Sequence, residues 1–171
     1  ALTVATAAPG LLGGDGPRTY FIGFTTPAEA RGIGGFMGNW AELTATDGRI
    51  SLSRFGRTLE LNRGPDVDAT RTISGPKEWL DTWGEYGFDN GPDGTTDREP
   101  WSNITISPHF PSTAQVIAEL YPQSGGRDVD GVFAMDPYVL QALLELTGPV
   151  QIVGSDVSLD ASNMIDFLLI D

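Results

Sequence analysis

The chain has 171 residues, of which 40% are hydrophobic, and a formal net charge of −13 at pH 7. This length is enough for one domain with a real core, and the acidic balance argues against nucleic acid as a partner, because phosphate backbones bind clustered lysine and arginine. The absence of cysteine excludes disulfides, thiol nucleophiles and thiolate metal sites.

Both ends of the sequence have helical character. Residues 1–12 read as the tail of a preceding helix or a linker, which Pro9 and Gly10 end, and they lack the pattern of a signal peptide. Residues 158–171 begin with a plausible cap and stop inside an apolar helix. We therefore expect one domain over 13–171, truncated at its carboxyl end, in a natural protein that continues in both directions. The sequence contains no apolar run of about 18 residues, the length that a membrane helix needs.

The first strands are marked by two apolar runs and a hairpin signal. Residues 19–24 are apolar enough to predict a strand that is buried on both faces rather than an edge strand. Asp47-Gly48 separates residues 40–46 from residues 49–54, and Asp-Gly between two strands is the strongest short-range signal for a β-hairpin. We therefore expect the second and third strands to pair antiparallel.

A glycine-dense stretch, residues 27–38, joins the first two strands. Four glycines in seven residues indicate a backbone that needs positive φ or approaches something closely. The stretch predicts either a tight β-connection with bulges or a ligand-binding loop, and its spacing fits neither a dinucleotide fingerprint nor a Walker loop. The candidate ligand contacts in it are Glu29, Arg31, Gly34 and Gly35.

The region from about 56 to 101 is rich in glycine, proline, aspartate and arginine, and it predicts a long loop excursion. Residues 76–83 within it predict a short helix with proline in its first turn. Excursions of this length are usually functional loops or lids, or partly disordered. Four aromatic residues of this region could stack on sugar rings or anchor the loop in the core: Trp79, Trp83, Tyr86 and Trp101.

From residue 112 onward the pattern alternates between helices and strands. We expect an amphipathic helix over 112–121, capped by Ser112, and then a buried strand over 130–136. A helix over 137–147, capped by Asp136, and a short strand over 150–153 follow. The second helix has a leucine core face formed by Leu140, Leu143, Leu144 and Leu146. This order indicates an α/β fold, with α+β as the alternative, in which helices pack on the faces of a mixed sheet.

Several short motifs occur in a specific order along nearly the whole chain. They are Pro17-Arg18-Thr19-Tyr20, Glu29-x-Arg31-x-x-Gly34-Gly35-Phe36-x-Gly38, Val129-Asp130-Gly131-Val132 and Leu146-Thr147-Gly148-Pro149-Val150. In this order they resemble the bacterial domain-of-unknown-function family 4012. The name of that family gives no activity. The resemblance implies a bacterial cell-envelope protein with an amino-terminal membrane anchor, whose extracytoplasmic part includes this domain.

A weaker resemblance rests on the hairpin strand that ends at Arg54, on Asn103, and on the motif around Asp130. Their order is similar to that in the LytR-CpsA-Psr family. Those enzymes transfer glycopolymers from a polyprenyl-pyrophosphate carrier to peptidoglycan, with arginines on the pyrophosphate, Mg²⁺ held by aspartates, and a carboxylate base. The resemblance implies a similar fold, Arg54 and Arg18 as phosphate ligands, and Asp15 near the metal. Here Phe55 stands where that family has an aspartate.

The chemistry of pyrophosphate transfer sets requirements of its own. It needs positive charge on the phosphate oxygens, usually a divalent ion, and a base for the attacking hydroxyl. Four arginines flank the expected sheet ends and could converge: Arg18, Arg31, Arg54 and Arg57. The carboxylates that could hold Mg²⁺ or act as the base are Asp15, Glu29, Asp130 and Asp136. Asp130 is the candidate base. Each also has a structural alternative: Glu29 and Arg31 could tie down the glycine loop, Asp130 could fix a turn, and Asp136 could be a helix cap. The single His109 reads as a loop residue.

Two functions remain open. A magnesium-assisted phosphotransferase that attaches glycopolymers to the cell wall predicts a deep apolar groove with arginines at its mouth. A non-catalytic envelope module that binds a glycan, a polyprenyl-phosphate-linked polymer or a protein predicts a filled core, no groove, and arginines in surface ion pairs. Because Phe55 replaces the expected carboxylate and the arginine set is incomplete, we favour the binding module, for which no cofactor is certain; Mg²⁺ is expected only for the enzyme.

Overall fold

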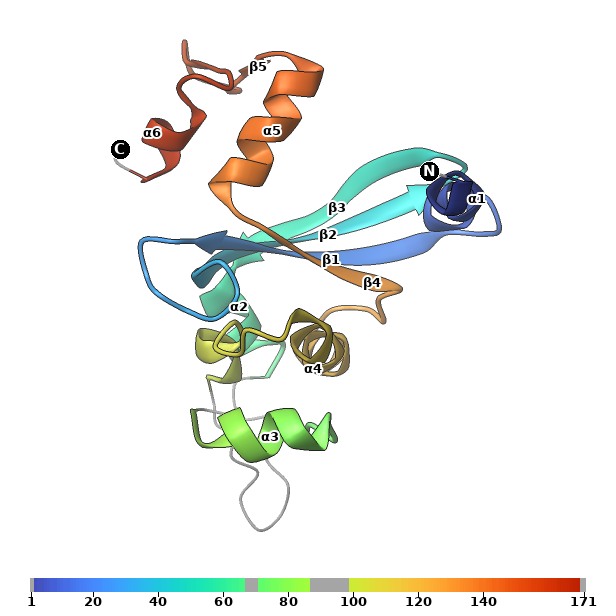
Figure 1. The fold of residues 1–171 in the computed structure, drawn as a ribbon, viewed down its shortest axis with the longest axis vertical. Coiled ribbons are helices and arrows are strands. Elements are labelled where there is room, and N and C mark those ends of the chain that lie inside the picture. The colour runs from blue at the N-terminus through green and yellow to red at the C-terminus, as the bar shows by residue number, and fades with distance from the viewer. Residues whose placement is uncertain (1, 67–70, 87–98, 170–171) are drawn as a thin grey trace.

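The computed structural model describes residues 2–66, 71–86 and 99–169 (Figure 1). In chain order its elements are α1 (Leu2–Leu11), β1 (Arg18–Thr26), β2 (Phe36–Thr46), β3 (Arg49–Arg57), α2 (Thr58–Arg63), α3 (Lys77–Trp83), the 3-10 turns η1 (Gly84–Tyr86) and η2 (Pro100–Asn103), α4 (Phe110–Gln123), β4 (Gly131–Met135), α5 (Pro137–Thr147), β5 (Val150–Gln151), β6 (Ser158–Leu159) and α6 (Met164–Leu169).

Four strands form a mixed sheet in the order β3-β2-β1-β4. β1 and β3 both pair antiparallel with β2, whereas β4 lies parallel to β1. The hairpin between β2 and β3 turns at Asp47 and Gly48, whose φ angles of 50° and 80° are those that a tight hairpin turn requires. The α/β fold, the antiparallel hairpin and the central position of the first strand are therefore confirmed.

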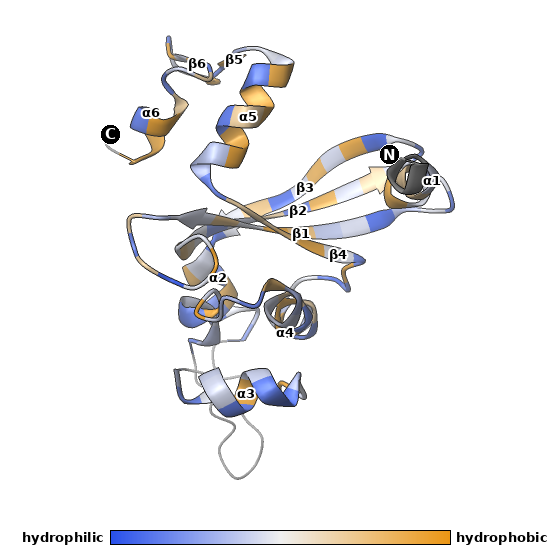
Figure 2. Ribbon diagram, in the orientation of Figure 1, coloured by the Kyte–Doolittle hydropathy of each residue, from blue (hydrophilic) through white to orange (hydrophobic). Residues whose placement is uncertain are grey.

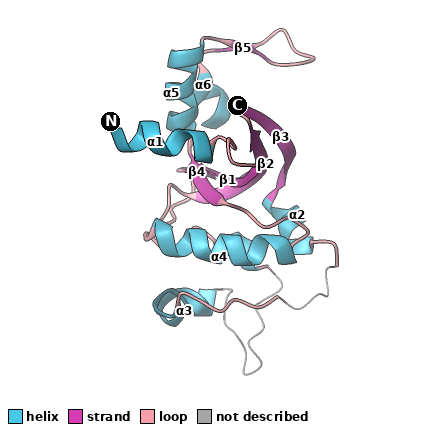
Figure 3. Cartoon of the chain, turned by 90° about the vertical axis from the view of Figure 1, so that its right-hand side faces the viewer, coloured by secondary structure: helices cyan, strands magenta, loops and turns pink. Residues whose placement is uncertain are grey.

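The two faces of the sheet are covered by different layers of helices. Figure 3 shows α4 on one face and α1, α5 and α6 on the other. The face toward α4 carries the main hydrophobic core, in which aromatic side chains of the sheet meet those of α4 and η2. Figure 2 shows that hydrophobic residues also occur on α5 and α6. The core residues with the lowest exposure are Phe21, Trp101, Ile104, Val116, Leu120 and Tyr121.

Three expected helix ends are wrong. α1 continues through Pro9 to Leu11, and the chain turns only at Gly13, which has a φ of 79°. α4 begins at Phe110, two residues before Ser112, because Pro111 fits the first turn of a helix. α6 begins only at Met164, since residues 158–159 form a strand with β5. The helix expected over 76–83 is confirmed within one residue.

The second half of the chain is less buried than the apolar pattern predicts. β4 is only partly buried, and the side chain of Phe133 is 47% exposed. Of the leucines expected to form the core face of α5, Leu144 is buried, whereas Leu143 and Leu146 are 42% and 85% exposed. This exposure follows from the position of α5, which projects away from the sheet (Figure 1).

The region expected to be a loop excursion contains regular structure. β3 extends to Arg57, and α2, which no pattern predicted, follows it directly. Glu60 in the first turn of α2 accepts a hydrogen bond from the backbone N–H of Arg57 at 3.3 Å, which explains the helix start at that point. Within the expected excursion, residues 67–70 and 87–98 lie outside the described residues.

Candidate functional site

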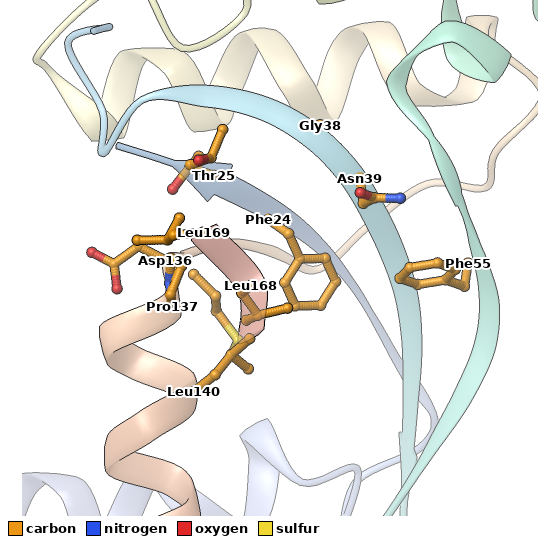
Figure 4. A pocket seen from close by; sticks show the side chains of 12 residues that line it. Phe24, Thr25, Gly38, Asn39, Phe55, Asp136, Pro137, Leu140, Leu168 and Leu169 are labelled. Atoms are coloured by element: carbon orange, nitrogen blue, oxygen red, sulfur yellow. The ribbon is translucent and has the colours of Figure 1, made fainter. Parts of the chain in front are cut away.

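A groove of about 450 Å³ lies between the sheet and the two helices α5 and α6. Its walls are mostly apolar, and all four strands of the sheet contribute to them (Figure 4). The lining residues are Phe24, Thr25, Thr26, Gly38, Asn39, Phe55, Met135, Asp136, Pro137, Leu140, Leu168 and Leu169.

The groove results from the alternation of side chains along the strands. Phe21 points into the core beneath the sheet, so Phe24, three residues later, points to the opposite face. Its ring centroid lies 6.1 Å from that of Phe55 on β3. Ala41, the register partner of Phe55 on β2, is too small to fill the space between them. The aromatic floor of the groove is therefore formed by two strands that do not pair with each other.

One wall of the groove is formed by the start of α5. Asp136 caps this helix by accepting a hydrogen bond from Val139 N–H at 2.9 Å, which confirms the expected cap. The cap fixes the direction in which α5 leaves β4. Leu140, one turn into the helix, therefore points into the groove toward Leu168 of α6 (Figure 4).

Polar groups occur at the rim of the groove. Asn39 lines it, and Arg57 is the register partner of Asn39 on β3, so both side chains leave the sheet on the groove face. Arg57 is exposed and has no ion pair within the described residues. Arg57 therefore places a cation on the groove face of the sheet, next to Asn39, although it is not itself a lining residue.

Asp130 is bound to β1 at the other end of the sheet. Its carboxylate accepts a hydrogen bond from Arg18 at 2.7 Å and another from Thr19 N–H at 2.8 Å. The Thr19 N–H, followed by Arg18, holds the pKa of Asp130 below its ordinary value. The backbone N–H of Asp130 also donates to the carbonyl of Thr19 at 2.7 Å. These contacts fasten the start of β4 to β1.

The four candidate arginines do not converge. Arg18 pairs with Ala45 of β2, and Arg57 pairs with Asn39 of the same strand. The two arginines are therefore six residues apart along the sheet, which corresponds to about 20 Å. Arg54 faces α4: its guanidinium carbon lies 5.1 Å from the ring centroid of Trp40, and its Nη1 donates to the carbonyl of Gly125 at 2.7 Å. Arg18, Arg54 and Arg57 therefore do not gather around one pyrophosphate, because strand pairing spreads them along and across the sheet.

The glycine loop is held by the chain itself. Ile33 N–H donates to the carbonyl of Thr105 at 3.0 Å, and the Thr105 hydroxyl donates to the carbonyl of Gly35 at 2.8 Å. Glu29 contributes its backbone carbonyl, which accepts from Phe36 N–H at 3.1 Å. Arg31 lies with its guanidinium 6.0 Å from the ring centroid of Phe36. These contacts fit the alternative of a tight β-connection.

Gly35 allows a matched test of that connection. Its φ is 108°, and a Cβ there would overlap the Thr26 carbonyl, whereas a Cβ at Gly38 would meet no atom within 4 Å. We expect Gly35→Ala to lower the free energy of unfolding by about 2–4 kcal/mol. Gly38→Ala, in strand β2, should change it by less than about 1 kcal/mol. Urea denaturation of both variants measures this. Equal effects would show that the loop is not constrained at Gly35.

Comparison with protein families decides the family of the chain. A family model described as "Protein of unknown function (DUF4012)" matches residues 15–171. The chain belongs to the DUF4012 family. Neither the curated proteins nor the solved structures give a match. For this DUF4012 chain, the similarity to LytR-CpsA-Psr transferases stays a prediction.

In this DUF4012 chain, Asp15 is the residue that the resemblance placed near a metal ion. Asp15 is exposed and lies near Arg18. The hydrogen bond to Asp130 raises the pKa of Arg18, and the negative charge of Asp15 adds to this effect. Within residues 2–66, 71–86 and 99–169, no group of three or more histidine, aspartate or glutamate side chains could hold a metal. Over the same residues, no helix is long and apolar enough to span a bilayer.

The candidate sugar-stacking aromatics of this DUF4012 chain differ in exposure. Trp79 and Trp101 are 3% and 0% exposed and belong to the core, whereas Tyr86 is 45% exposed. Asn103 donates from its Nδ2 to the carbonyl of Tyr86 at 2.8 Å, so it positions η1. His109 is exposed, precedes the first residue of α4, and shares a hydrogen bond of 2.7 Å with Ser112.

Glu42, which no sequence pattern marked, is fully buried in the DUF4012 core. Its carboxylate accepts hydrogen bonds from the Tyr121 hydroxyl at 2.8 Å and from Arg127, whose Nε lies at 3.0 Å. Burial raises the pKa of Glu42, but the hydrogen bonds from Arg127 and Tyr121, together with the positive charges of Arg127 and Arg54, bring it below its ordinary value. The available signal was the alternation in β2, because Glu42 shares the inward face with Trp40.

Proposed function

We propose that this DUF4012 domain is an extracytoplasmic cell-envelope module that binds the apolar chain of a polyprenyl-phosphate-linked glycan. The observation that carries the proposal is the groove of about 450 Å³ lined by Phe24, Phe55, Leu140 and Leu168. The envelope location rests on the bacterial family that the sequence motifs resemble.

The walls of the groove suit a flexible hydrocarbon chain. Its volume is within the range of small-molecule sites, which is about 300–1,000 Å³. Phe55 is 59% exposed and Leu168 is 45% exposed, so a bound chain would remove both from water. Arg57 at the rim supplies the positive charge that a phosphate at the end of the chain would need.

The groove supports binding more than phosphoryl transfer. A phosphotransferase needs its base and its cations around one phosphate. Here Asp130 and Arg18 bind each other about 20 Å along the sheet from Phe24. The apolar groove expected of the enzyme is present, but the expected arginines do not gather at its mouth. The filled core expected of the binding module is present beneath the sheet, whereas its expected lack of a groove is wrong.

A titration with geranylgeranyl phosphate tests the proposal. We expect binding that isothermal calorimetry detects as a heat change. We expect the affinity to weaken about tenfold in Phe55→Ser, because that change removes apolar surface from the groove. Arg57→Ala should lower the affinity for geranylgeranyl phosphate but not the affinity for the corresponding alcohol, geranylgeraniol.

Leu52→Ser is the matched control. Leu52 is 62% exposed on the same strand but does not line the groove, so its replacement should leave the affinity unchanged. Absence of binding up to the solubility of the ligand, by a folded sample, would overturn the proposal. So would equal weakening by Phe55→Ser and Leu52→Ser, because the site would then not be the groove.

A further inference from the structure

The outer edge of β3 is open. β3 is the terminal strand of the four-stranded sheet, and only β2 pairs with it. Figure 3 shows no element of the described chain beside this strand on its outer side. All of its residues are exposed except Gly56. An exposed edge of this kind is a template for a further strand.

The two faces of β3 have different chemistry. Ile50, Leu52 and Phe55 are opposite Ala45, Leu43 and Ala41 of β2, and they are 57%, 62% and 59% exposed. The irregularity between Leu52 and Arg54 keeps Phe55 on the face of Leu52 despite the odd spacing. The β3 side chains on the face of Glu42 and Trp40 are instead polar or basic.

The charge of β3 is opposite to that of the whole chain. The strand RISLSRFGR has three arginines and no acidic residue, whereas the formal net charge of the chain is −13. A second copy of β3 would bring arginine against arginine, and like charges on paired strands are destabilising. The charge of the strand therefore favours an acidic partner over self-association.

We propose that the edge of β3 binds an extended peptide segment in which acidic and apolar residues alternate. The segment adds as a fifth strand, with main-chain hydrogen bonds to β3. Its apolar side chains lie beside Ile50, Leu52 and Phe55. Its carboxylates lie on the other face, beside Arg49, whereas Arg54 on that face is turned toward Trp40 and the carbonyl of Gly125. This surface shares Phe55 with the lipid groove, whereas Arg49, Ile50 and Leu52 do not line the groove.

The first test uses a capped nine-residue peptide of alternating glutamate and valine with the isotope-labelled 171-residue chain. We expect chemical-shift changes in the backbone amides of residues 49–57 and protection of these amides from hydrogen exchange. A peptide of alternating lysine and valine should bind at least about tenfold more weakly, because it meets the arginines with like charge. A glutamate–proline peptide, which lacks half of the N–H donors, should give no protection.

Arg49→Glu and Arg63→Glu are the matched variants. Both replace an exposed arginine by glutamate, but Arg63 lies on α2. We expect Arg49→Glu to weaken the glutamate–valine peptide about tenfold and Arg63→Glu to change its affinity less than about twofold. No binding up to the solubility of the peptide would overturn the proposal, as would shift changes centred on another element or equal effects of the two variants.

Discussion

Trp101→Ala is expected to lower the free energy of unfolding by about 3–5 kcal/mol. The Trp101 side chain is 0% exposed, and its ring centroid lies 5.6 Å from that of Phe21 and 6.5 Å from that of Tyr121. Its indole N–H donates to the hydroxyl of Ser124 at 2.8 Å. Alanine would leave a cavity at the contact between η2 and α4 and remove the donor to the Ser124 hydroxyl, which would keep only its own hydrogen bond to the carbonyl of Leu120. Urea denaturation monitored by circular dichroism measures the loss.

Tyr86→Ala is the matched control for this aromatic substitution. Tyr86 is 45% exposed, so its removal should cost less than about 1 kcal/mol. The pair of variants separates the two roles that the sequence left open for the loop aromatics. If Trp101→Ala kept full stability, Trp101 would not anchor the loop in the core, and the alternative role of stacking on a sugar ring would be favoured.

Glu42→Leu is expected to cost about 3 kcal/mol of stability at pH 7, because it leaves the buried Tyr121 hydroxyl without an acceptor and removes the partner of Arg127. The leucine replaces the carboxylate by an apolar side chain of similar size, so the loss reports the network rather than a cavity. Glu145→Leu, at an exposed position on α5, should change stability by less than about 1 kcal/mol.

The effect of Glu42→Leu should depend on pH. The folded-state pKa of Glu42 lies below its ordinary value, so the ionised carboxylate stabilises the fold above the unfolded pKa of about 4.3. This contribution is lost as the pH falls through the lower folded pKa. We therefore expect the difference in free energy of unfolding between the wild type and Glu42→Leu to become smaller below about pH 4. A difference that grew in acid would contradict the assigned direction of the pKa shift.

Local chemistry made part of the fold predictable. Asp47-Gly48 specifies its hairpin through two positive φ angles, and Asp136 caps α5 through one hydrogen bond, so both could be identified from neighbouring residues. The site could not be predicted in this way. The groove depends on which face Phe24 and Phe55 occupy and on the parallel pairing of β1 with β4, which are set by contacts between distant segments.

The arginines illustrate the same limit. Their residue type suggested a common anion, but convergence depends on strand order and register. Once β3, β2 and β1 are aligned, Arg54 is opposite Glu42 and Arg18 is opposite Ala45, so their positions along the sheet differ. Glu42 was missed for the opposite reason: an acidic residue within a strand reads as solvent-exposed until a buried partner such as Tyr121 is known.

The parallel pairing of β1 with β4 also bears on how the chain reaches its structure. The hydrogen bond between Arg18 and Asp130 joins residues 112 positions apart, whereas the β2–β3 hairpin closes through one turn. Bringing distant segments together costs chain entropy before their contacts contribute. The hairpin and α4 can therefore form early, while the central strand lacks its second neighbour until residues 131–135 arrive. During synthesis β1 thus keeps one edge open until residues 131–135 have emerged, and this open edge is exposed to mispairing.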